Sequence, residues 1–174
     1  GLGDVYKRQP QDASFTSIVV PTAVTEQLTY LLCVNVRNND PFLVVGPTGT
    51  GKSRVIEAAM NNTLSAEKFK PCVVAYTAKT TALQSQNIID ANFDKRRRGI
   101  YGPPLGTQSV IFVDDFNTPE VEEYGAQPPV ELIRQLLANG GFYDLQEMAF
   151  KSIVDTSIIT AMGPPGGGRN KISP

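Results

Sequence analysis

Residues 42–60 read FLVVGPTGTGKSRVIEAAM, and this stretch decides the fold because it joins three local signals. The apolar run 42–45 fits a strand that is buried on both faces, and residues 53–64 have the pattern of a helix. Between them, residues 46–53 match the phosphate-binding loop pattern G-x-x-x-x-G-K-S. A strand, a glycine-rich loop and a helix in this order indicate an α/β protein that binds a nucleotide.

The loop 46–53 predicts how the phosphates are held. Its glycines let backbone N–H groups turn inward, and the positive end of the following helix adds to the attraction. We expect Lys52 to reach the β- and γ-phosphates as a catalytic residue, and the hydroxyl of Ser53 to ligate Mg²⁺. The residues expected to contact the nucleotide here are Gly46, Pro47, Thr48, Gly49, Thr50, Gly51, Lys52, Ser53 and Arg54.

A second motif, SVIFVDDF over residues 109–116, is an apolar strand that runs into two aspartates. A phosphate-loop protein needs an acidic side chain at the tip of a nearby strand to hold Mg²⁺, and Asp114 fits this role. One expected strand and one expected helix separate Asp114 from Lys52 along the chain. This spacing is typical of motor-type ATPases, and we expect the two strands to lie side by side.

The composition excludes several classes of function. The chain has 174 residues, 41% of them hydrophobic and 19% charged, which suits one globular domain. Its net charge of −1 gives no basic field, and no apolar run reaches the length of a membrane span, so we expect neither nucleic acid nor membrane as a partner. Histidine is absent, which excludes a histidine base. Cys33 and Cys72 are expected to be free thiols.

Helical and strand patterns alternate along the chain, which predicts a mainly parallel sheet with helices on both sides. A basic run at 95–98 would lie on the solvated end of one helix, and the segment GPPGGGR (163–169) reads as a flexible connection more than as a second anion site. We expect strands at 42–45, 71–78, 109–116 and 155–163, helices at 22–37, 53–64, 80–96 and 128–139, an extended segment at 17–22, and small hairpins within 96–108 and 140–153.

Four segments together resemble the third AAA+ module of the dynein heavy chain family, in its axonemal form. They are VVGPTGTGKS (44–53), IFVDDFNTP (111–119), YGAQPPVELIRQ (124–135) and AMGPPGGGRN (161–170). The resemblance covers residues 16–174 and implies the large α/β subdomain of an AAA+ ATPase, a three-layer P-loop fold. We expect residues 1–15 to be an unstructured or non-native leader. The helical lid and the arginine finger of such modules would lie past residue 174.

The resemblance also implies cofactors, partners and further site residues. ATP and Mg²⁺ would be bound, and Val20 in VVPT (19–22) would contact the adenine. The neighbouring AAA+ modules of the same heavy chain would be the direct partners. Microtubules and other dynein chains would be reached through the full-length protein, in the cytoplasm, the cytoskeleton and the axoneme of a cilium or flagellum.

Two positions depart from the AAA+ pattern. AAA+ ATPases carry a glutamate after the metal-side aspartate to orient the attacking water, and here this position is Asp115, one methylene shorter. The polar sensor at the end of the fourth strand aligns with Gly163, which has no side chain, so Asn117 and Asn170 are the nearby candidates. A carboxylate that falls short of hydrogen-bond reach can lower the rate by roughly 10²-fold. We therefore expect ATP binding with slow hydrolysis, and regulation of the neighbouring modules.

Two other interpretations remain open from the sequence. A stand-alone P-loop ATPase or kinase would act on a separate substrate, although nothing after Gly99 has the pattern of an acceptor-binding lid. A non-hydrolysing module would use the nucleotide as a structural brace, which Asp115 and Gly163 both permit.

Overall fold

The computed structural model describes residues 20–172. The leader expected at 1–15 and the start of the extended segment expected at 17–22 lie outside the described residues. Within the described part of the chain, no helix combines the length and the apolar character needed to cross a membrane.

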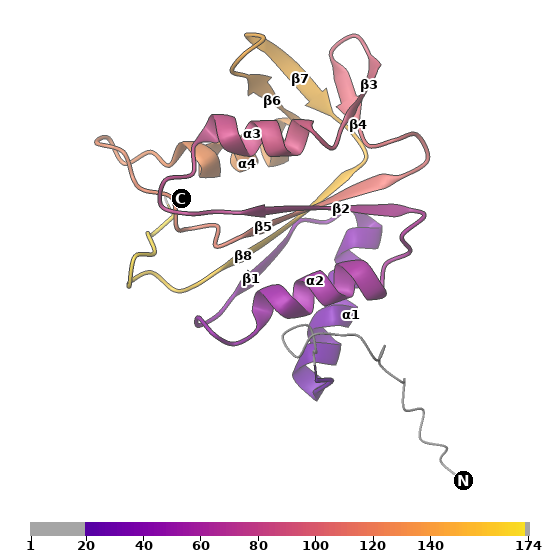
Figure 1. Cartoon of the computed structure of the whole chain (residues 1–174), viewed down its shortest axis with the longest axis vertical. Coiled ribbons are helices and arrows are strands. Elements are labelled where there is room, and N and C mark those ends of the chain that lie inside the picture. The colour runs from indigo at the N-terminus through magenta and orange to yellow at the C-terminus, as the bar shows by residue number, and fades with distance from the viewer. Residues whose placement is uncertain (1–19, 173–174) are drawn as a thin grey trace.

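A four-stranded parallel sheet forms the middle layer (Figure 1). Its strands follow the order β1-β8-β5-β2, and every neighbouring pair is parallel. The bounds are Phe42–Val45 for β1, Phe69–Ala75 for β2, Gln108–Asp114 for β5 and Thr156–Met162 for β8. The predicted α/β fold is confirmed, and the predicted strands agree with these bounds to within a few residues.

One expectation about this sheet is wrong, because β1 and β5 are not neighbours. Strand β8 lies between them, and its Ile159 is in register with Phe42 of β1 on one side and Phe112 of β5 on the other. Since the three strands are parallel, their carboxyl ends still lie along the same edge of the sheet. The phosphate loop and the two aspartates therefore emerge at one edge with the end of β8 between them.

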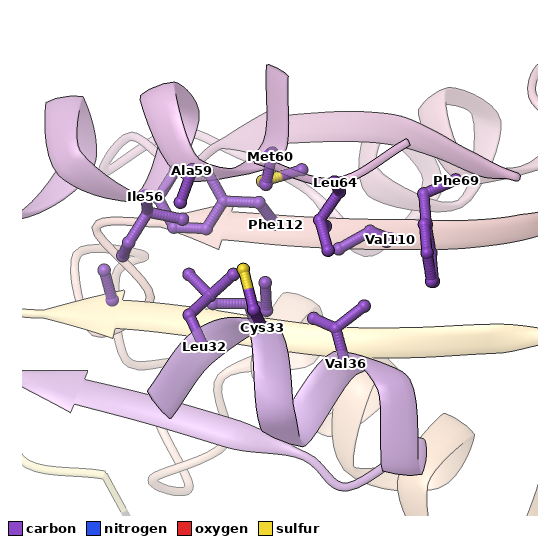
Figure 2. Close-up of a cluster of buried hydrophobic side chains, with 12 residues drawn as sticks. Leu32, Cys33, Val36, Ile56, Ala59, Met60, Leu64, Phe69, Val110 and Phe112 are labelled. Atoms are coloured by element: carbon purple, nitrogen blue, oxygen red, sulfur yellow. The ribbon is translucent and has the colours of Figure 1, made fainter. Parts of the chain in front are cut away.

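Helices cover both faces of the sheet, as predicted (Figure 1). The helices are α1 (Ala23–Asn38), α2 (Lys52–Asn62), α3 (Ala82–Asp90) and α4 (Pro128–Asn139). Val110 and Phe112 of β5 pack with α1 and α2 on one face, and Figure 2 shows these helices closing over Phe112. Ile111 and Val113 pack with α3 and α4 on the other face. Alternate residues of one apolar strand thus fill two separate cores, and together these fix the position of the aspartates that follow.

A second sheet of four strands, in the order β3-β4-β7-β6, lies beyond α3 and α4 (Figure 1). Its strands are β3 (Asp94–Arg97), β4 (Ile100–Gly102), β6 (Gly141–Asp144) and β7 (Ala149–Ile153). Both suggested hairpins are present, as β3–β4 and β6–β7, and β4 pairs with β7 in parallel to join them. Lys151 of β7 connects this sheet to α3, because its Nζ lies 3.0 Å from the carboxylate of Asp90. The same Nζ also pairs with Asp144 of β6, at 2.5 Å.

Helix α3 is shorter than the predicted helix 80–96. Thr81 caps its start, and the helix ends at Asp90. The side-chain amide of Asn92 donates to the carbonyl of Ile88 at 2.8 Å, so one of the last carbonyls of the helix is satisfied by a side chain. The chain then enters β3 after three further residues.

The basic run 95–98 is consequently not a helix end, and that expectation is wrong. Most of the run belongs to the β3–β4 hairpin. The guanidinium of Arg96 donates to the carbonyl of Pro103 at 2.6 Å and pairs with Asp155 at 3.0 Å, so it connects the hairpin to the start of β8. The cysteines agree with expectation, since Cys33 and Cys72 are buried free thiols, and burial raises the pKa of Cys72 to about 11.

Candidate functional site

The loop between β1 and α2 has the backbone that a phosphate site requires. Gly49 and Gly51 have φ angles of 81° and 76°, in the left-handed region that favours glycine. Gly51 is the N-cap of α2 and offers no side-chain oxygen to the first N–H groups of the helix. These groups are therefore available to an anion, and the helix dipole favours one there.

Lys52 folds back over the loop that precedes it. Its ammonium donates to the carbonyl oxygens of Gly46 and Pro47, both at 2.7 Å. A Cβ on Gly46 would lie 3.3 Å from Cδ of Lys52, so glycine at this position leaves room for the lysine side chain. Among the described residues no carboxylate forms an ion pair with this ammonium. It is a cation held by these two carbonyl dipoles and, at 3.5 Å, by the hydroxyl of Thr50, and a phosphate can replace them.

The carboxylates of the two aspartates at the end of β5 have different partners. Asp114 is the last residue of the strand, and its Oδ1 accepts a hydrogen bond from the backbone N–H of Asp115 at 3.0 Å. Asp115 then has a φ of 51°, which is unusual for a residue other than glycine and is common at functional sites. Its Oδ1 forms an ion pair with Nη2 of Arg169 at 2.8 Å. Asp114 has no such cationic partner among the described residues, so its second oxygen can meet a metal ion.

Two aromatic residues, the buried Tyr76 and the half-buried Phe116, support the turn after β5. The N–H of Tyr76 donates to the carbonyl of Asp114 at 3.0 Å, and the ring of Tyr76 stacks on that of Phe116 with centroids 6.2 Å apart. The phenol donates to the carbonyl of Pro129 at 2.9 Å. Burial raises the pKa of Tyr76 to about 12, so the phenol stays a neutral donor. This packing keeps the aspartates in a fixed place relative to α4.

Six of the nine predicted phosphate-loop residues and both predicted metal ligands line one cavity of about 220 Å³. Val20 is not among its lining residues and is 67% exposed near the start of α1, so its contact with adenine stays a prediction. Gly46, Pro47 and Thr50 shape the loop without lining the cavity. The cavity is lined by Thr48, Gly49, Gly51, Lys52, Ser53, Arg54, Asp114, Asp115, Met162 and Arg169.

The end of β8 differs from what the sequence suggested. Asn117 is 1% exposed, and its side-chain amide donates to the carbonyls of Gly163 at 2.8 Å and Asn170 at 3.1 Å. The amide of Asn170 donates to the carbonyl of Pro119 at 2.7 Å. Neither asparagine lines the cavity. Their side chains hold the segment 163–170 against the turn after β5, and a sensor role for either stays a prediction.

The sequence interpretation missed Arg169. It follows the glycines of a segment that was expected to be a flexible connection, yet residues 166 and 169 close a hydrogen-bonded turn. The arginine then extends past Gly163 into the cavity, where it meets Asp115. The sequence signal that could have identified Arg169 is a single arginine that follows a run of glycines, a few residues after a strand that ends at the site.

The residues present fit a magnesium nucleotide. Ser53 and Asp114 offer a hydroxyl and a carboxylate, which are ligand types that Mg²⁺ prefers, and both line the cavity. The loop offers backbone donors and the ammonium of Lys52 to phosphates. Arg54 also lines the cavity and lies 3.5 Å from Glu57 one turn along α2.

Comparisons with known proteins agree with this geometry. A family model described as "P-loop containing dynein motor region" matches residues 7–174. Over 93% of its length the chain is 48% identical to dynein axonemal heavy chain 12 of Mus musculus, and over 94% it is 46% identical to dynein axonemal heavy chain 1 of Rattus norvegicus. The chain spans 5% and 4% of the lengths of these two relatives. Because the family model covers nearly all of the sequence, the chain belongs to the family of P-loop-containing dynein motor regions.

Proposed function

We propose that this chain is an ATP-binding AAA+ module of an axonemal dynein heavy chain, the third of its motor, and that it hydrolyses ATP slowly. One observation carries the proposal. Lys52 and Ser53 at the start of α2 line the same cavity as Asp114 and Asp115 at the end of β5. Phosphate-binding and metal-binding groups thus face each other at one edge of a parallel sheet, where P-loop proteins bind nucleotides.

Each residue has a distinct role in this proposal. Lys52 exchanges its two carbonyl partners for the β- and γ-phosphates, while Ser53 and Asp114 hold Mg²⁺. Asp115 orients the attacking water. Two features make this last role inefficient: its side chain is one methylene shorter than glutamate, and its carboxylate must leave Arg169 before it can act on water.

The relatives support a place for this module in a larger machine. Because they are named axonemal dynein heavy chains and are far longer than this chain, we propose that the module works inside such a heavy chain, in the axoneme of a cilium or flagellum. It would pass its nucleotide state to neighbouring AAA+ modules. Microtubules and other dynein chains would be partners of the whole protein.

A second candidate function is a nucleotide brace that does not hydrolyse ATP. The ion pair between Asp115 and Arg169 favours it, because a carboxylate held in this way does not activate water. Single-turnover hydrolysis separates the two candidates. Slow formation of phosphate supports the ATPase, and bound ATP that stays intact supports the brace.

Titration of a fluorescent ATP analogue tests binding itself. We would use the complete heavy-chain motor with its other phosphate loops disabled, and compare Lys52→Ala with Lys79→Ala, which removes an exposed lysine outside the cavity. Lys52→Ala should abolish binding, because the phosphates lose their mobile cation, and Lys79→Ala should not change it. Equal affinity in both variants would contradict the proposal.

A further inference from the structure

The cavity contains a cation, Arg169, that comes neither from the phosphate loop nor from α2. Lys52 enters from the start of α2, and Arg169 enters from the segment that follows β8. Asp115 also lines the cavity and is the carboxylate that Arg169 contacts, at 2.8 Å. Two cations from different parts of the chain therefore converge on the place where the loop would hold phosphates.

The guanidinium of Arg169 has unused donors. Arginine carries five N–H groups, and the only side-chain hydrogen bond found for Arg169 within residues 20–172 is the one from Nη2 to Asp115. Its Nε is buried and has no hydrogen-bond partner. A buried donor without a partner is costly in a folded protein, so the arrangement is incomplete until an acceptor arrives.

The surroundings hold Arg169 in this place. A Cβ on Gly163 would lie 2.5 Å from Cδ and 2.6 Å from Nε of Arg169, so only glycine at the end of β8 lets the arginine pass. The neighbouring Asn170 is fixed to Asn117 by a backbone hydrogen bond of 2.8 Å and a side-chain hydrogen bond of 3.1 Å. Arg169 can therefore reach the cavity only because the residue at the sensor position, Gly163, has no side chain.

We propose that Arg169 binds the terminal phosphate of a nucleoside triphosphate and releases Asp115 when it does so. The ion pair is a weak competitor, because the side chains of Arg169 and Asp115 are 20% and 45% exposed and solvent screens their attraction. A terminal phosphate carries more negative charge and accepts two parallel hydrogen bonds from a guanidinium. Exchange of the carboxylate for the phosphate is thus favoured.

This exchange makes Arg169 the residue that distinguishes a triphosphate from a diphosphate. With a diphosphate bound, Arg169 keeps Asp115; with a triphosphate bound, the carboxylate is free to orient water. The inference rests on the proposed function, because it needs a nucleotide in the phosphate loop. It assigns to Arg169 the sensing contact that the side chain at residue 163 cannot make.

The test compares affinities for ATPγS and ADP in the complete motor with only this phosphate loop intact. Arg169→Gln should weaken ATPγS binding by about tenfold to a hundredfold, the effect of losing a charge-assisted hydrogen bond, and should change ADP binding by less than about twofold. Arg169→Lys keeps the charge but loses the planar fork, so its effect should be intermediate. A purely structural role for Arg169 would weaken both nucleotides alike and would overturn the inference.

A second variant tests the exchange of partners. Asp115→Asn removes the competing carboxylate and should tighten ATPγS binding by up to about fivefold, but this gain should disappear in the Arg169→Gln background. The same gain in both backgrounds would show that only the charge of Asp115 matters and would overturn the exchange. If the unmodified motor binds neither ATPγS nor ADP at this loop, the proposed function itself fails, and the inference fails with it.

Discussion

Gly163→Ala breaks the contact between Arg169 and Asp115 without removing either charge. The new Cβ would lie 2.5 Å from Cδ of Arg169, whereas non-bonded carbon atoms are comfortable at about 3.5–4.0 Å. The arginine must therefore retreat by about 1 Å. A hydrogen bond that now measures 2.8 Å would then exceed the length at which such bonds hold. Gly163 is not among the residues with positive φ, so alanine itself is unstrained.

The expected effect on nucleotide binding is smaller than that of Arg169→Gln. The displaced guanidinium stays in the cavity and still attracts the phosphates, but it loses a well-aligned hydrogen bond to them. The net value of one such bond corresponds to about a threefold to tenfold loss of ATPγS affinity. ADP lacks the γ-phosphate that would meet Arg169, so its affinity should not change.

Titrations of ATPγS and ADP against the complete motor measure this effect, and the double variant provides the control. If Gly163 acts only by leaving room for Arg169, then Gly163→Ala should add nothing in the Arg169→Gln background. Equal weakening of ATPγS binding by Gly163→Ala in both backgrounds would refute a role of Gly163 in leaving room for Arg169. That role is also refuted if Gly163→Ala keeps the original ratio of the two affinities while Arg169→Gln changes it.

Two further predictions concern catalysis and stability. Asp115→Glu should raise phosphate release at this site by about tenfold to a hundredfold, from restored reach to the water, and adding Gly163→Asn should reduce that gain because any side chain at 163 displaces Arg169. Lys151→Met should lower the free energy of unfolding by about 3–5 kcal/mol at pH 7, because it strands Asp144 and Asp90 without their cation. Burial opposes ionisation of Asp144, but the hydrogen bond from Lys151 and two backbone amides outweigh it and hold its pKa below the ordinary value. The stability that Asp144 contributes is present above its unfolded-state pKa and is lost as the pH falls through its folded-state pKa. The free energy of unfolding, measured in urea, should therefore differ less between the variant and the unmodified protein at acid pH than at pH 7.

The parts of the structure that depend on neighbours in the chain could be predicted from the sequence. The apolar strand 42–45, the glycines of the loop and the helix after Lys52 are local signals, and they form where expected. The pattern at 109–116 likewise predicted a buried strand that ends in aspartates. The cap of α3 at Thr81 is a local feature of the same kind, since a cap depends on only three following residues.

The parts that depend on distant residues could not be predicted in this way. Nothing local to β1 and β5 shows that β8 inserts between them, because strand order is set by the packing of whole strands. The end of α3 was missed for a similar reason. Residues 94–97 prolong an acceptable helical pattern, and only their pairing with β4, which in turn pairs with β7, turns them into a strand.

The surroundings of Asp115 show why such contacts matter for the proposed function. Taken separately along the sequence, Asp115 and Gly163 are two losses: a carboxylate that is too short and a sensor without a side chain. In the structure both meet the same guanidinium, since Arg169 occupies the space beside Gly163 and binds the carboxylate of Asp115. Asp115, Gly163 and Arg169 then form one arrangement. In it, Arg169 takes the place of the sensor side chain and determines whether the carboxylate of Asp115 is free. A change at any one of the three positions should therefore alter the response to the terminal phosphate, and not only the speed of the chemical step.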